Sequence, residues 1–121
     1  MRNYEIMRSV LLAVKHTKEP ISLIDFEGMC EHSDLRDELI RLSDEGLIAQ
    51  KITSKNYATV KIESLTKEGA DFARSIENGE VFAIIHKTLE RANVDLSYPL
   101  LQEVCTEIVK RYVMSKIPAI I

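Results

Sequence analysis

The stretch from Ser33 to Gly69 constrains the fold more than any other part of the chain. Ser33 is a good N-cap residue, and acidic residues follow it in what would be the first turn of a helix. The apolar residues that come next recur at helical spacing: Leu35, Leu39 and Leu42. Gly46 stands where a left-handed residue commonly ends a helix. The sequence therefore predicts a helix over Asp34–Glu45.

Two apolar segments after this helix have the pattern of strands. Leu47–Ile52 and Ala58–Ile62 flank a polar loop, and apolar and polar residues alternate in the second segment. Ile21–Phe26 predicts either a third, edge strand or the first turn of a helix. Leu65–Gly69 then begins another helix, with Thr66 as its N-cap. This order is typical of a winged helix-turn-helix, so we expect a mainly α fold with a small antiparallel β-hairpin or three-stranded sheet (α+β), followed by C-terminal helices.

Helical patterns also occupy both ends of the chain. The first begins after Asn3 and reaches about Thr17, and the last begins after Ser97, with Pro99 in its first turn. Between them, one helix ends at Asn78-Gly79 and another starts at about Glu80. We expect residues 1–78 to form the winged-helix domain and residues 79–121 to form a helical extension that packs on it as one compact unit.

Composition is that of an ordinary globular protein. The 121 residues are 45% hydrophobic and 29% charged, which suits one domain with a real core. No apolar run is long enough to span a membrane, and the N-terminus has no secretory signal pattern, so we expect a cytoplasmic protein. Cys30 and Cys105 are far apart and are expected to be reduced thiols.

An enzymatic function is not expected. The three histidines, His16, His32 and His86, share no metal-binding spacing, and the four glycines form no phosphate loop. Cys30 and His32 are the one tight pair, but near neighbours on a loop rarely reach the geometry of a catalytic pair. The sequence therefore predicts no catalytic residue, metal, cofactor or small-molecule substrate.

Charge is distributed unevenly along the central stretch. The net charge of −3 argues against a protein that holds DNA by bulk electrostatics. The predicted helix Asp34–Glu45 carries five acids against Arg36 and Arg41, which suits a solvated face or a protein-binding surface as well as a DNA reader. Residues 50–62 carry three lysines and no acid, which suits phosphate contact, although lysines also protect sheet edges. The candidate nucleic-acid-binding residues are Arg36, Arg41, Lys51, Lys55, Asn56, Tyr57 and Lys61.

The last predicted helix carries a broad apolar stripe, and the chain ends in an apolar tail. The stripe is either core or the interface of a homodimer, and an exposed Ile-Ile end would be prone to association. The candidate interface residues are Leu101, Val104, Ile108, Tyr112, Ile120 and Ile121.

Four motifs together resemble an uncharacterised bacterial and phage family, the domain of unknown function 2513. They are the opening Arg2–Arg8, the helix end Leu42–Ile48, the helix start Leu65–Phe72 and the helix Ser97–Val113. The resemblance spans nearly the whole chain. It implies a winged-helix fold and a phage or prophage setting, and no named function.

Two functional hypotheses follow. The first is a transcriptional regulator of phage or prophage origin that binds double-stranded DNA, with Arg36 and Arg41 on the helix and Lys51, Lys55 and Tyr57 on the wing. The second is a protein-interaction module that does not bind DNA and acts on a host protein. The acidic helix favours the second hypothesis, and the usual role of the fold favours the first.

Overall fold

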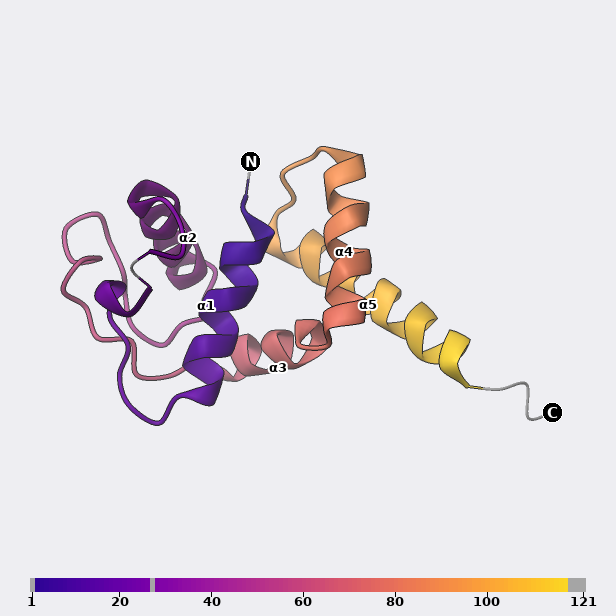
Figure 1. The fold of residues 1–121 in the computed structure, drawn as a ribbon, viewed down its shortest axis with the longest axis horizontal. Helices are drawn as coiled ribbons and strands as arrows, with labels where there is room; N and C mark the ends of the chain where they lie inside the picture. Colours follow the sequence, from indigo (N-terminus) through magenta and orange to yellow (C-terminus); the bar gives the residue numbers. More distant parts are fainter. Residues whose placement is uncertain (1, 27, 118–121) are drawn as a thin grey trace. The chain divides into compact units, whose positions relative to one another are not determined.

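A computed structural model of the chain describes residues 2–26 and 28–117. The described residues contain five α-helices and one short 3₁₀ helix, in the order α1, η1, α2, α3, α4 and α5 (Figure 1). They form two compact units, an N-terminal unit (Arg2–Ala73) and a C-terminal unit (residues 74–117). The division between these units lies inside α3 (Lys67–Ile76). The predicted domain boundary between residues 78 and 79, and the packing of both parts as one compact unit, stay predictions.

In the N-terminal unit, α1 (Tyr4–His16) packs against α2 (His32–Asp44). The predicted cap of α1 is confirmed, because the Asn3 side chain accepts a hydrogen bond from the amide of Ile6 at 3.1 Å. The cap of α2 differs from the prediction. Glu31 occupies the N-cap position without a side-chain hydrogen bond, and Ser33 lies inside the first turn. The predicted leucines of α2 are buried: Leu35, Leu39 and Leu42.

The predicted α+β winged helix, with its hairpin or three-stranded sheet, is wrong. The described residues contain no strand, and only two isolated antiparallel bridges occur among them, Ile21 with Ile62 and Ile48 with Leu65. The segment expected as a third strand forms η1 (Leu23–Phe26) instead, which is closer to its helical alternative.

Side chains explain why no hairpin ladder forms, because they occupy backbone groups that a ladder would need. Ser43 donates to the carbonyl of Gln50 at 3.0 Å and accepts from the amide of Ile52 at 2.8 Å. Asn56 accepts from the amide of Thr53 at 2.7 Å and donates to the carbonyl of Lys51 at 2.9 Å. Residues 54–59 consequently fold into successive turns.

The start of α3 is fixed against the end of α2. The Thr66 hydroxyl donates to the carbonyl of Gly46 at 2.6 Å and accepts from the amide of Gly69 at 3.0 Å, so the predicted cap is confirmed. Gly46 has the positive φ of +75° expected after a helix. Gly69 is required for another reason, because a Cβ there would lie 2.0 Å from the carbonyl oxygen of Leu47.

The C-terminal unit is built on α4 (Gly79–Ala92) and α5 (Tyr98–Lys116), which pack against each other (Figure 1). Asn78 caps α4 by accepting from the amides of Glu80 and Val81. The inward residues of the pair are fully or almost fully buried: Val81, Ile85, Leu89, Leu101 and Cys105. Tyr112, near the end of α5, donates to the carboxylate of Glu80 in the first turn of α4 at 2.6 Å.

Candidate nucleic-acid interface

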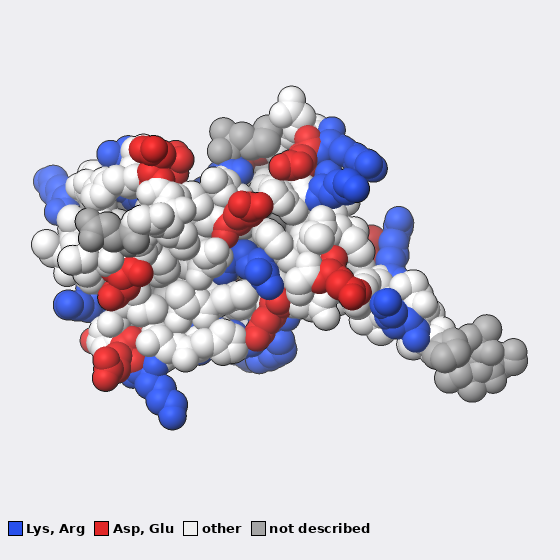
Figure 2. All heavy atoms as spheres, viewed as in Figure 1, with Lys and Arg blue, Asp and Glu red and all other residues white. Residues whose placement is uncertain are grey.

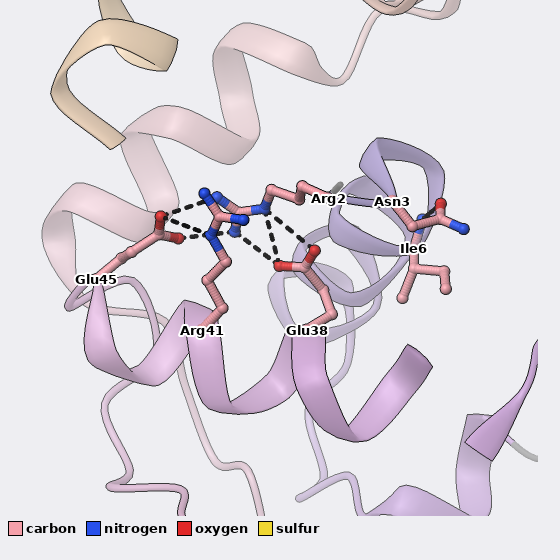
Figure 3. A network of polar contacts seen from close by, with 6 residues as sticks. All are labelled: Arg2, Asn3, Ile6, Glu38, Arg41 and Glu45. Carbon is pink, nitrogen blue, oxygen red and sulfur yellow. Dashed lines mark hydrogen bonds and ion pairs between the residues drawn. The ribbon is translucent and has the colours of Figure 1, made fainter. Parts of the chain in front are cut away.

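A buried cluster of charges connects the start of the chain to α2. The Arg2 guanidinium donates through Nε and Nη2 to Glu38, at distances of 2.7 to 3.1 Å. It also donates through Nη1 and Nη2 to the two oxygens of Glu45, at 2.8 and 2.7 Å. Arg41 adds a bond to Glu45 at 3.4 Å (Figure 3). We call these four residues the Arg2 cluster.

Burial and pairing act against each other in this cluster. The side chains of Arg2 and Glu38 are 1% and 3% exposed. Burial alone would lower the pKa of Arg2, but hydrogen bonds and charges from Glu38 and Glu45 outweigh it and hold that pKa above its ordinary value. Burial raises the pKa of Glu38, and the bonds from Arg2 offset part of this effect. The guanidinium thus compensates two carboxylates that the fold takes out of water.

Sequence reasoning missed this cluster, although it left a signal. Glu38 stands three residues after Leu35 and four before Leu42, on the inward side of α2, and Glu45 follows it after seven residues. An acid in an apolar stripe requires a cationic partner. The position of that partner, 36 residues earlier in the chain, is decided by the tertiary structure.

The outward side of α2 exposes its acids more than its arginines. The side chains of Asp37 and Asp44 are 69% and 57% exposed, whereas those of Arg36 and Arg41 are 37% and 29% exposed. Arg36 bonds to Asp37 at 3.1 Å, and Arg41 belongs to the Arg2 cluster. The structure therefore does not bring Arg36 and Arg41, the candidate DNA-binding residues of α2, onto one cationic surface.

The segment from Gln50 to Lys61, here the lysine loop, carries the other candidates. Lys51, Lys55 and Lys61 are all exposed, and Lys51 forms an ion pair with Asp44 at 3.3 Å. Asn56 has a structural role, because its amide holds the turns of the loop together. The three lysines therefore stand on a segment of defined conformation.

Tyr57 attaches the lysine loop to the beginning of α2. Its hydroxyl lies 3.2 Å from Nε2 of His32, and the two rings meet edge to face. The guanidinium of Arg36 lies 6.0 Å from the centre of the Tyr57 ring. The structure thus brings Arg36 and Tyr57 together, and it adds His32, which was not among the predicted binding residues.

Cys30 and His32 line a pocket of about 230 Å³ with mostly apolar neighbours from η1 and α2. Burial, followed by the charges of Asp34 and Glu31, raises the pKa of Cys30, so this residue stays a thiol at neutral pH. The described residues contain no group of His, Cys, Asp or Glu arranged to hold a metal ion.

The predicted interface residues of the last helix have different environments. Leu101 is fully buried within the chain, whereas Val104, Ile108 and Tyr112 are half-buried. Ile120 and Ile121 lie outside the described residues. A homodimer stays a prediction, but Leu101 is part of the core of its own unit.

Comparison with known protein families, curated proteins and solved structures found no match to this chain. The resemblance to the uncharacterised phage family stays an expectation. Among the helices of residues 2–26 and 28–117, none combines the length and apolar character needed to cross a membrane.

Proposed function

We propose that the protein binds double-stranded DNA through the lysine loop. The observation that carries this proposal is a set of three exposed lysines on a loop that Tyr57 attaches to α2 beside Arg36. Lysine ammonium groups bind phosphate as point charges, and a loop of fixed conformation presents them without a large cost of ordering. A role in regulating transcription is part of the proposal, and the family resemblance adds a phage or prophage setting.

The loop leads the contact and α2 does not. A helix that presents Asp37 and Asp44 outward would place two carboxylates toward a phosphate-lined groove. On the face drawn in Figure 2, Lys and Arg side chains are interspersed with Asp and Glu, and no broad area of one sign appears. Binding through a few phosphate contacts, with little reading of base sequence, is the mode that suits this distribution.

Salt dependence gives a quantitative test. Three lysines that neutralise phosphates should give a slope of about −3 when the logarithm of the association constant is plotted against the logarithm of salt concentration. Fluorescence anisotropy with a labelled duplex measures this slope. A duplex that is not bound even at low salt would contradict the proposal.

Charge reversal locates the contact. Lys55→Glu/Lys61→Glu should remove duplex binding, because it turns two of the three proposed phosphate contacts into repulsive charges. Both lysines are exposed and lie outside the Arg2 cluster, so the fold should be retained. Lys18→Glu/Lys87→Glu makes the same change of charge at exposed positions outside the loop and should retain most of the binding. Circular dichroism of both variants checks that each is folded. Equal losses in the two variants would show that net charge, and not the loop, determines binding.

The exposed acids of α2 favour a second candidate function, a protein-interaction module whose partner presents a basic surface. This candidate predicts that Asp37→Lys/Asp44→Lys removes a protein association that the Lys55→Glu/Lys61→Glu variant retains. DNA binding through the loop predicts the reverse order of effects, because removing acids near Lys51 strengthens its attraction for phosphate.

A further inference from the structure

The outward side of α5 separates its charges along the helix. Leu101 and Cys105 are buried and define the inward side of this helix. Glu103 and Glu107 lie in the first half of the exposed surface, whereas Lys110 and Arg111 lie in the second half. Glu107 and Arg111 already form a surface ion pair at 3.2 Å within the helix. The exposed side of α5 is therefore acidic in its N-terminal half and basic in its C-terminal half.

Large apolar side chains lie beyond these charges at both ends of the helix. Leu100 is exposed near the beginning, and Val113, Met114 and Ile117 are exposed near the end. Each of the four leaves roughly half or more of its surface open, and three of them lie within five residues of one another at the end of α5.

We propose that α5 pairs in antiparallel orientation with α5 of a second copy of this chain, across a twofold axis. Antiparallel pairing places the acidic half of each helix over the basic half of the other. A parallel pair would oppose like charges. A twofold interface repeats every contact, so each favourable pair occurs twice.

One register satisfies both charge and geometry. At 100° per residue, the side of α5 opposite Leu101 and Cys105 is centred on Glu103 and Met114. An antiparallel register that is symmetric about the level midway between Ile108 and Val109 brings this side of each copy against the other. In that register the opposed residues are Glu107 with Lys110, Glu103 with Met114, and Leu100 with Ile117. The register thus covers the apolar ends and pairs the charges at the centre. This choice follows from the burial of Leu101, which removes that residue from the interface.

Sedimentation equilibrium of the full chain tests the association. We expect a mass that rises with concentration toward twice the 13.8 kDa of one chain. A mass of one chain at every concentration would overturn the proposal. The measurement needs no DNA, so its result is independent of the proposed DNA binding.

Charge-reversal variants test the register. Glu103→Lys/Glu107→Lys gives an all-basic face, and Lys110→Glu/Arg111→Glu gives an all-acidic face. Each should weaken self-association about tenfold or more, because the two symmetry-related pairs of residues 107 and 110 become repulsive. An equal mixture of the two should associate, since the all-basic helix then faces the all-acidic one. The fourfold variant, which carries both double changes, should associate with itself again.

Lys87→Glu/Arg91→Glu is the matched control, because it makes a similar change of charge at exposed positions on α4. It should leave self-association within about twofold of the original chain. Circular dichroism confirms that each variant retains its helices. Dimers that persist in both double variants, or a fourfold variant that stays monomeric, would show that this face of α5 is not the interface.

Discussion

The two units differ in where their ion pairs lie, because the N-terminal unit has a buried pair in addition to its surface pairs. In the N-terminal unit the fold encloses Arg2 and Glu38 almost completely and surrounds them with further charged partners. In the C-terminal unit the described ion pairs, such as Arg111 with Glu107, lie at the surface. Arg–Glu pairs of the same chemical type should therefore differ greatly in their effect on stability, because only the buried pair leaves an uncompensated charge when one partner is removed.

The largest expected effect comes from breaking the buried pair. Arg2→Met should lower the free energy of unfolding by about 3 kcal/mol, because Glu38 would stay buried without its cation. Arg111→Met removes a similar residue from the exposed pair and should cost less than about 0.5 kcal/mol. Urea denaturation of both variants measures the difference. Equal losses of unfolding free energy in the two variants would contradict the larger effect expected for the buried pair.

A second comparison concerns the space around two glycines, Gly69 and Gly79. Gly69→Ala should cost about 2 kcal/mol, since the added Cβ meets the backbone of Leu47 and α3 must shift. Gly79→Ala at the start of α4 is the control, because no atom lies within 4 Å of the added Cβ. It should be neutral or slightly stabilising. Thermal unfolding of the two variants provides the readout, and a loss at Gly79 as large as that at Gly69 would contradict the close approach.

The smallest expected effect concerns the two thiols and involves no change in stability. Burial raises the pKa of Cys105 to about 12, so almost none of it is thiolate at neutral pH. Cys30 is half-exposed, and its pKa is also raised. Alkylation of the native protein should therefore modify Cys30 first, faster as pH rises, and reach Cys105 only when the C-terminal unit opens. Mass spectrometry of partly labelled protein resolves the order, and early labelling of Cys105 would contradict its burial.

Local signals predicted the helices well. Asn3 and Thr66 cap helices as expected, and Gly46 follows α2 with the expected positive φ. These features depend on residues within one turn of each other, so the sequence carries the information directly. The hairpin failed for the opposite reason. A strand needs a partner strand, and here Ser43 and Asn56 satisfy the backbone groups that the partner would have used.

The candidate nucleic-acid interface shows the same difference between local features, which the sequence predicts, and long-range contacts, which it does not. The sequence indicated that residues 50–62 are basic, and the structure keeps those lysines exposed. The sequence could not indicate that Glu38, Arg41 and Glu45 belong to a cluster with Arg2. Nor could it indicate that Tyr57 contacts His32 and Arg36. Both arrangements join residues at least 20 positions apart, beyond the reach of helical periodicity.

The sequence by itself determined where the helices lie and where charge is concentrated, because both depend on the order of neighbouring residues. Only the tertiary structure decided which charges face water. Five acids in the Asp34–Glu45 segment look equivalent in the sequence. Folding buries Glu38 against Arg2 and leaves Asp37 and Asp44 outside. A charge withdrawn from water requires a partner, and Arg2 at the start of the chain supplies it.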